Sequence, residues 1–341
     1  MDAARIVILR HDALAWLVDR LDLVGIDPAA VPVPSLPGRG TPPAGSPTPA
    51  GSRAEAAPRP GADPQAFAEL ALLRKIAGRF PAMDRDAGFL RIRRHLTAHV
   101  HKGIEAMRRS GSLPYCLRVA LALEACGTAP ESYRPLVLRA LARYTEAGGG
   151  WQGWSPVELA YYLDVLGIRH DLPAPALLFP GPLRRTAVGG APPRRSEAYR
   201  TTHAIFCVTD FGRVDARSTI GDLLPETCDH VEALLADLVA REDWDLVAET
   251  LMCCAFLGLR PEGLVEDAWE GLAGAGDHLA RPVGRGAGPG AAARREREFA
   301  DHYHTTVVTL MAALFETAGA TVAASRPFAV GPGPGEGTGA A

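Results

Sequence analysis

Residues 199–212 read Tyr-Arg-Thr-Thr-His-Ala-Ile-Phe-Cys-Val-Thr-Asp-Phe-Gly. This stretch predicts a helix of about three turns that stops at Gly212, because glycine readily adopts the left-handed conformation that ends helices. His203 lies at the apolar centre of the run, beside Ala204, Ile205 and Phe206. Other helical segments share this layout, and they end at Gly127, Gly167, Gly258 and Gly319.

Four of these segments carry an ionisable residue at the same distance from their terminal glycine. The distances are 127−118 = 9, 167−158 = 9, 212−203 = 9 and 258−249 = 9, and the residues are Arg118, Glu158, His203 and Glu249. Equal offsets place side chains at the same height along parallel helices. The sequence therefore predicts a layer of polar residues that faces one shared interior.

The spacing of the glycines indicates a repeat architecture. The intervals are 167−127 = 40, 212−167 = 45, 258−212 = 46 and 319−258 = 61 residues. A period near 45 residues with two helices in each unit is typical of stacked helical hairpins. No segment alternates apolar and polar residues for long enough to form a sheet. We expect an all-α chain whose hairpins close into an α/α toroid, so that the polar layer faces a central cavity.

The expected helices of the body can be given by residue range. They are 67–80, 87–108, 114–126, 133–145, 156–166, 199–211, 226–240, 243–257, 264–272 and 299–318, with irregular excursions at 170–195 and 282–293.

Composition divides the chain into four parts. Residues 1–26 contain a helix with one apolar face, and residues 64–320 form the toroid domain. Residues 27–63 are rich in Pro, Ala, Gly and Ser, which predicts a flexible linker because such a segment buries little apolar surface. Residues 321–341 contain the run Gly-Pro-Gly-Pro-Gly and predict a disordered tail.

Charge and cysteine content argue against several classes of protein. The chain has 47% apolar residues, 22% charged residues and a formal net charge of −3, which gives no electrostatic case for binding nucleic acid. The six cysteines form no Cys-x-x-Cys pair and lie mostly in apolar helical runs, as is typical of reduced core residues. No apolar run is long enough to span a membrane. We therefore expect a cytoplasmic protein, and the bias towards Arg, Ala, Gly and Pro favours a bacterial one.

Two motifs resemble the α/α-toroid superfamily of terpenoid cyclases and protein prenyltransferase β subunits. Asp301-His302-Tyr303-His304-Thr305 is similar to the segment that supplies a zinc-binding histidine in prenyltransferases, and residues 148–154 (Gly-Gly-Gly-Trp-Gln-Gly-Trp) are similar to the repeat turns of the superfamily. Asp243-Trp244-Asp245 opens the helix where that family has its Asp-x-Cys ligands, 304−243 = 61 residues earlier. The resemblance implies a divalent metal such as Zn²⁺ at Asp243, Asp245 and His304.

The departures from these families concern the chemistry. Asp245 replaces the zinc-binding cysteine, and Leu246 interrupts the acidic motif of the cyclases. A cavity for carbocations would be lined with aromatic rings, whereas only 6% of the residues are aromatic and the predicted layer is charged. Prenyl transfer and cyclisation therefore remain only an alternative for the reaction. An alternative to the metal site also remains open, in which Asp243 and Asp245 are acidic residues at the N-terminus of a helix, where the helix dipole favours negative charge.

The residues of the polar layer are suited to acid/base catalysis. One helical face presents Tyr199, His203 and Cys207, and a second presents Asp245, Glu249 and Cys253, because residues four apart share a face. We expect His203 to act as acid or base with Glu158 or Glu249 as its partner, while Arg118 holds an anionic group and Tyr199 completes the site. No residue is predicted to bind an organic cofactor.

This chemistry predicts an enzyme of bacterial specialised metabolism that acts on a small-molecule or peptide-derived substrate. Two alternatives remain open. The chain could be a non-catalytic toroid that binds a peptide or a small molecule, and the four polar residues could be a hydrogen-bonded network that only holds the helices together.

Overall fold

The chain is all-α, as the sequence predicts. The computed structural model describes residues 2–28, 64–110, 112–146, 155–180, 194–279 and 290–324, and these residues contain no β-strand. Within the same residues, no helix combines the length and the apolar character that crossing a membrane requires.

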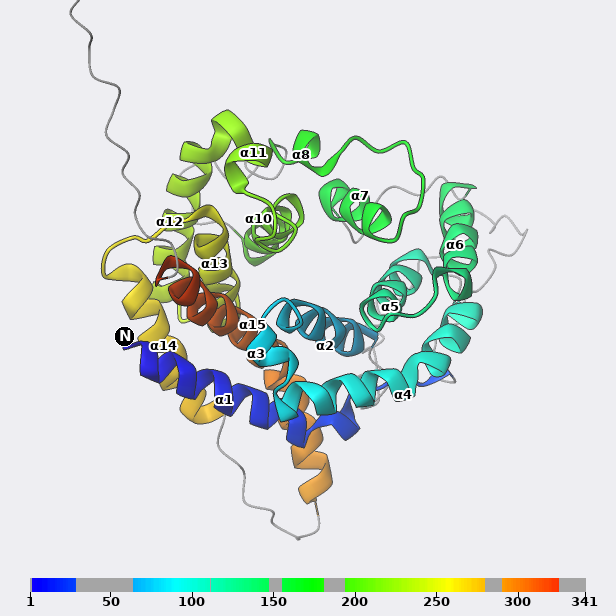
Figure 1. Cartoon of the computed structure of the whole chain (residues 1–341), viewed down its shortest axis with the longest axis horizontal. Coiled ribbons are helices and arrows are strands. Elements are labelled where there is room, and N and C mark those ends of the chain that lie inside the picture. The colour runs from blue at the N-terminus through cyan, green and yellow to red at the C-terminus, as the bar shows by residue number, and fades with distance from the viewer. Residues whose placement is uncertain are drawn as a thin grey trace, which may run out of the picture.

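Six helices lie around the centre of the molecule (Figure 1). They are α2 (Pro64–Ala77), α5 (Leu113–Ala125), α7 (Pro156–Val165), α10 (Arg195–Val208), α13 (Trp244–Leu257) and α15 (Ala291–Ala324). Each contacts the next one along the chain, and α15 also contacts α2. We call these six the inner helices.

A second set of helices packs against the outside of the inner helices (Figure 1). These helices are α1 (Ala3–Asp19), α4 (Ala87–Ser110), α6 (Arg134–Glu146), α12 (Leu224–Ala240) and α14 (Leu264–Leu279). The short helices α3 (Pro81–Asp84), α8 (Pro175–Leu178) and α11 (Ala216–Ile220) connect longer elements, as do 3₁₀ turns at Leu21–Leu23, Pro130–Ser132 and Gly221–Leu223.

The sequence of α13 explains its central place. Its residues from Asp245 to Cys254 are all buried, and the helix contacts α10, α12, α14 and α15. A helix that is apolar on every side is stable in water only when neighbours cover it completely. Asp245 and Glu249 are therefore carried into the interior by a helix that apolar packing holds in place.

The glycines that were predicted to end helices do so in three of five cases, because α10 already ends at Val208 and the left-handed residues Asp210 and Phe211, with φ angles of 45° and 50°, precede Gly212. Gly127, Gly167, Gly212 and Gly258 have φ angles of 72°, 62°, 73° and 69°, in the left-handed region that residues with a side chain rarely adopt. The prediction for Gly319 is also wrong, because α15 continues through Gly319 to Ala324. Glycine costs a helix about 1 kcal/mol but does not forbid it, and the next five residues, Ala-Thr-Val-Ala-Ala, are compatible with a helix.

Other predicted boundaries also shift. Helix α15 begins at Ala291, inside the predicted excursion 282–293, and α14 extends from the predicted end at residue 272 to Leu279. Helix α10 begins at Arg195, four residues before the predicted start. The predicted tail 321–341 has helical structure at its first four residues. Helix ends are set by tertiary contacts as well as by local signals, so such shifts are expected.

Some predictions concern residues outside the described part of the chain. They concern residues 29–63 of the predicted linker 27–63, residues 325–341 of the predicted tail 321–341, and the turn at residues 148–154 that resembles the toroid superfamily. The N-terminal part lies within the described residues, where α1 packs on α15, α4 and α14. Trp16 of α1 stacks on Phe299 of α15, with ring centroids 6.0 Å apart.

Candidate functional site

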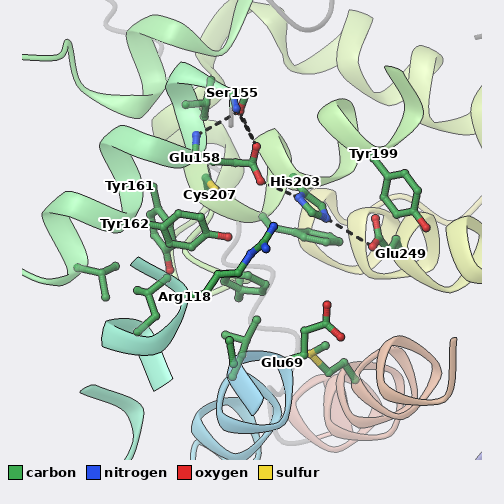
Figure 2. Close-up of a pocket in the computed structure, with 18 of the residues that line it drawn as sticks. Glu69, Arg118, Ser155, Glu158, Tyr161, Tyr162, Tyr199, His203, Cys207 and Glu249 are labelled. Atoms are coloured by element: carbon green, nitrogen blue, oxygen red, sulfur yellow. Dashed lines mark hydrogen bonds and ion pairs between the residues drawn. The ribbon is translucent and has the colours of Figure 1, made fainter. Parts of the chain in front are cut away.

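A cavity of about 1130 Å³ is lined by residues of all six inner helices. Ligand sites in proteins usually measure about 300–1,000 Å³, so this cavity can hold a sizeable organic molecule. The N-terminal half of the inner helices contributes Glu69, Ser155 and Tyr199 to its wall, and the C-terminal ends contribute Lys75 and Glu124. Figure 2 shows that the labelled side chains on these helices point towards a common space.

The four residues of the predicted polar layer all line this cavity. Arg118 comes from α5, Glu158 from α7, His203 from α10 and Glu249 from α13 (Figure 2). Tyr199 lines it as well, one turn before His203 on α10. His203 lies within 3.5 Å of both Glu158 and Glu249, so these three side chains meet in the structure. The four residues therefore share one cavity, as predicted, whereas the chemical roles of the residues stay predictions.

His203 lies between two carboxylates. Its Nδ1 is 2.8 Å from Oε1 of Glu158, and its Nε2 is 3.5 Å from Oε1 of Glu249. The side chain of His203 is 36% exposed and that of Glu249 only 1%, so the imidazole faces the cavity while Glu249 supports it from behind. Burial lowers the pKa of His203, but the Glu249 and Glu158 carboxylates outweigh burial and raise that pKa to about 10. The ring is therefore protonated at neutral pH.

Glu158 is oriented by the N-terminus of its own helix. Ser155 is the N-cap of α7: its Oγ accepts a hydrogen bond from the backbone N–H of Glu158, and its backbone N–H donates to Oε2 of Glu158 at 3.1 Å. This is a capping box, which the Ser-x-x-Glu sequence encodes locally. Oε2 is thus occupied by Ser155, which leaves Oε1 for His203. Burial raises the pKa of Glu158, but the hydrogen bond and charge of His203 lower it below its usual value.

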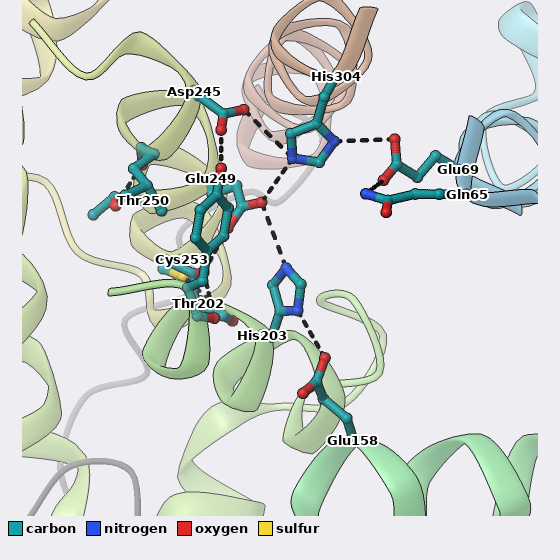
Figure 3. Close-up of polar contacts among 12 residues, drawn as sticks. Gln65, Glu69, Glu158, Thr202, His203, Asp245, Glu249, Thr250, Cys253 and His304 are labelled. Atoms are coloured by element: carbon teal, nitrogen blue, oxygen red, sulfur yellow. Dashed lines mark hydrogen bonds and ion pairs between the residues drawn. The ribbon is translucent and has the colours of Figure 1, made fainter. Parts of the chain in front are cut away.

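A second histidine extends the network. Nδ1 of His304 is 3.0 Å from Oε2 of Glu69, and its Nε2 is 3.5 Å from Oε1 of Glu249 and 3.4 Å from Oδ1 of Asp245. The side chains Glu158, His203, Glu249, His304 and Glu69 therefore alternate between carboxylate and imidazole across α7, α10, α13, α15 and α2 (Figure 3). We call these five residues the carboxylate–imidazole chain.

The charges of this chain stabilise one another. Burial raises the pKa of Glu249, but the protonated His203 and His304 lower it to about 2, and Thr202 Oγ1 donates a hydrogen bond to its Oε2 at 2.5 Å. Burial lowers the pKa of His304, yet its hydrogen bonds with Glu249 and Glu69 raise it to about 11. Buried charges are tolerated only when they are paired and hydrogen-bonded in this way.

Glu69 was missed as a site residue by the sequence analysis. Its Oε1 accepts a hydrogen bond from Gln65 Nε2 at 2.7 Å, which fixes the carboxylate beside His304. A signal for it exists, because Gly78 follows α2 and 78−69 = 9, the same offset as in the other four helices. Gly78 does not have the positive φ angle of the other terminal glycines, so it does not mark the end of a helix as clearly.

The residues predicted to bind a metal are engaged in ion pairs. Asp243 Oδ1 lies 3.2 Å from Arg195, and Asp245 Oδ2 accepts hydrogen bonds from Arg195 at 2.9 Å and from Tyr199. Asp243 and Asp245 thus share Arg195, and of these two carboxylates it is Asp245 that contacts His304. In the described ranges, no group of three or more His, Cys, Asp and Glu side chains has the arrangement to hold a metal ion. The predicted triad is therefore not assembled as a set of metal ligands.

Asp245 nevertheless belongs to the polar region of the cavity wall. Burial raises its pKa to about 6, although the nearby positive charge of His304 acts in the opposite direction. Its Oδ1 is buried and has no hydrogen-bond partner among the described residues, while Oδ2 is the oxygen that Tyr199 and Arg195 contact. Tyr199 therefore acts structurally here as a hydrogen-bond donor that holds Asp245 near His304.

A second region of the wall, which adjoins the polar one, is mostly apolar and aromatic. The rings of Tyr161 and Tyr162 lie 5.4 Å apart, and those of Phe206 and Phe211 also lie 5.4 Å apart, measured between centroids. All four line the cavity together with Cys207. Burial raises the pKa of the Cys207 thiol, so it remains a neutral, apolar group. Its predicted counterpart Cys253 is buried, with Sγ 3.9 Å from the carbonyl oxygen of Thr202.

The comparisons with known proteins give one positive result. Comparison of the chain with the curated proteins and with the solved structures finds no match. A family model described as "Domain of unknown function (DUF6895)" matches residues 42–314, which include all six inner helices up to Leu314 of α15 and every residue of the carboxylate–imidazole chain. The match covers more than half of the 341 residues, and the chain therefore belongs to the DUF6895 family.

Proposed function

We propose that the chain is an enzyme built on an α/α toroid of helical hairpins, and that the central cavity is its active site. The contacts of each inner helix with the next, and of α15 with α2, support a closed arrangement. The glycine intervals of 40–46 residues between Gly127 and Gly258 support a repeat of about 45 residues. The resemblance to terpenoid cyclases and prenyltransferases contributes only this architecture to the proposal and not the reaction.

The observation that carries the proposal is the position of His203 between Glu158 and Glu249 at the cavity surface. A protonated imidazole that is held by one short contact at Nδ1 can donate its other proton to a substrate. The Nε2–Glu249 distance of 3.5 Å is long for a hydrogen bond, so an acceptor atom of a substrate can compete for that N–H. His203 is then a general acid, Glu158 orients it, and Glu249 stabilises its charge.

The substrate is a small organic molecule or a peptide-derived one. The cavity volume of about 1130 Å³ and the aromatic side chains Tyr161, Tyr162 and Phe206 provide an apolar surface for its body. Specialised metabolism is the setting in which we place such an enzyme. No step of this proposal needs a metal.

Untargeted mass spectrometry can test catalysis before the substrate is identified. Purified wild-type protein is incubated with a small-molecule extract of the source cells, and compounds that disappear or appear are recorded. We expect His203→Gln to slow such conversion by about 100-fold or more, which is the usual contribution of a general acid. His11→Gln is the matched control, because His11 is exposed on α1 and does not line the cavity.

One observation favours a second candidate function. Each nitrogen of His203 and His304 already faces a carboxylate, so the charges of the carboxylate–imidazole chain are matched before any substrate binds. Such a network suits a binding protein that uses the cavity without chemistry. In that case a compound is retained through gel filtration by both the wild type and His203→Gln, and no conversion occurs in either.

A further inference from the structure

The charged side chains that line the cavity contain more bases than acids. Four acids line it, namely Glu69, Glu124, Glu158 and Glu249; six bases line it, namely Lys75, Arg79, Arg118, Arg200, His203 and His304. Both histidines carry a positive charge because carboxylates contact their nitrogens. Asp210, which does not line the cavity, lies 3.7 Å from Arg79 but also pairs with Arg213, so it leaves the positive surplus of two unchanged. Asp243 and Asp245 share the single cation Arg195, which adds one negative charge beside the wall and reduces the surplus to one.

Three of the four acids contact an imidazole, and the fourth contacts a lysine. Glu69 is 3.0 Å from His304, Glu158 is 2.8 Å from His203, and Glu249 lies within 3.5 Å of both rings. Glu124 is 2.6 Å from Lys75. A ligand with an ammonium group would have to displace one of these bases. The acids that line the cavity therefore position bases, and the net charge of the cavity wall is positive.

Arg118 supplies positive charge in the middle of the cavity. It extends from α5 into the space between Tyr162 and His203, on the side opposite Glu249 (Figure 2). A guanidinium group binds a carboxylate through two parallel hydrogen bonds, which gives both strength and orientation. Tyr161 and Tyr162 lie on the same side of the cavity as Arg118 (Figure 2), and together with Phe206, which also lines the cavity, they can hold an apolar body.

We infer that the cavity binds an apolar molecule with a single carboxylate, and that Arg118 is the residue that recognises this carboxylate. This inference rests on the proposed function in so far as it names the substrate class of the same site. A single negative charge matches the surplus of one positive charge. A phosphate ester would bring a second negative charge close to Glu158, which is ionised.

Isothermal titration calorimetry with three probes of equal length tests the inference on the full chain. The probes are hexanoate, hexanol and hexylamine. We expect the wild type to bind hexanoate about tenfold more tightly than hexanol, which corresponds to one charge-assisted hydrogen-bonded contact, and to bind hexylamine most weakly. Arg118→Met should reduce the affinity for hexanoate to that for hexanol and leave hexanol unchanged. Arg139→Met, on the exposed face of α6, is the matched control and should change nothing.

One further variant keeps the test decisive. If Arg118→Met does not fold, Arg118→Lys retains the charge and should still weaken hexanoate binding selectively, because lysine cannot form the paired contact. Equal or tighter binding of hexylamine, equal behaviour of Arg118→Met and Arg139→Met, or binding of none of the probes overturns the inference. If the protein prefers hexanoate but converts no compound, the proposed catalysis is wrong and the inference about the carboxylate stands. If conversion depends on His203 but hexanoate is not preferred, the inference is wrong and the proposed catalysis stands.

Discussion

The two regions of the cavity wall are built on different principles. The polar region is the carboxylate–imidazole chain on α7, α10, α13, α15 and α2, in which each charge depends on its neighbours. The region around Tyr161, Tyr162, Phe206 and Phe211 contains packed rings, edge to face for the two tyrosines and stacked for the two phenylalanines, and each ring contributes mainly its own buried area. Removal of one charge leaves others buried and unpaired, whereas a smaller apolar side chain leaves only a gap. The polar region should therefore be much less tolerant of substitution than the aromatic one.

Glu249→Ala should have the largest effect. Glu249 is 1% exposed and contacts both protonated histidines, so its loss leaves two positive charges close together in the interior. Breaking a buried ion pair in this way costs about 3–5 kcal/mol of the free energy of unfolding, measured by urea denaturation. Glu232→Ala, at an exposed position of α12, is the control and should change stability by less than about 0.5 kcal/mol. A loss for Glu249→Ala as small as that of the control would contradict the proposed interdependence of the charges.

Alkaline pH should weaken the polar region next. The pKa values of His203 and His304 are raised in the folded state from about 6.5 to about 10 and about 11. The folded state therefore holds these protons more tightly than the unfolded state, and their stabilising effect is complete below pH 6.5. It is lost progressively as the pH rises from 6.5 through 10 to 11. Urea denaturation between pH 6 and pH 10 should show a falling free energy of unfolding, and the double variant His203→Gln/His304→Gln should show a flatter profile.

Phe206→Leu should have a smaller effect, although Phe206 is only 5% exposed. Exchange between apolar side chains of similar volume usually costs less than about 1.5 kcal/mol. Leu138→Ala, on the exposed face of α6, serves as the control and should be nearly neutral. If Phe206→Leu destabilised the protein as much as Glu249→Ala, the distinction between the two regions would be lost.

Of the four predicted changes in stability, the one caused by Ser155→Ala should be the smallest. It removes the N-cap of α7 and should cost about 1 kcal/mol, whereas Ser155→Thr should retain most of the stability because threonine also caps helices. The variant also releases Oε2 of Glu158, so the pKa of His203, followed by NMR, should change while the fold is kept. An unchanged titration of His203 would show that the capping box does not orient Glu158.

The sequence predicts the parts of the site that depend on local geometry. Glycine at the end of a helix adopts a left-handed conformation for steric reasons, so Gly127, Gly167 and Gly258 could be placed without a structure. Because the rise per residue of a helix is constant, a common offset of nine residues then predicted that Arg118, Glu158, His203 and Glu249 face one interior.

Which side chains contact one another was decided by the tertiary structure. His304 was predicted beside Asp243 and Asp245 as a metal ligand, yet its ring nitrogens face Glu69, Glu249 and Asp245. Glu69 and His304 are 235 residues apart in sequence, and they meet only because α15 packs on α2.

The sequence by itself therefore determined the helical class, the helix ends at Gly127, Gly167 and Gly258 and the residues of the polar layer, because each of these follows from short-range geometry. Only the tertiary structure decided that Glu69 and His304 complete the carboxylate–imidazole chain. The physical reason is that the charge on a buried imidazole depends on the carboxylates within a few ångströms, and the packing of distant helices determines which carboxylates those are.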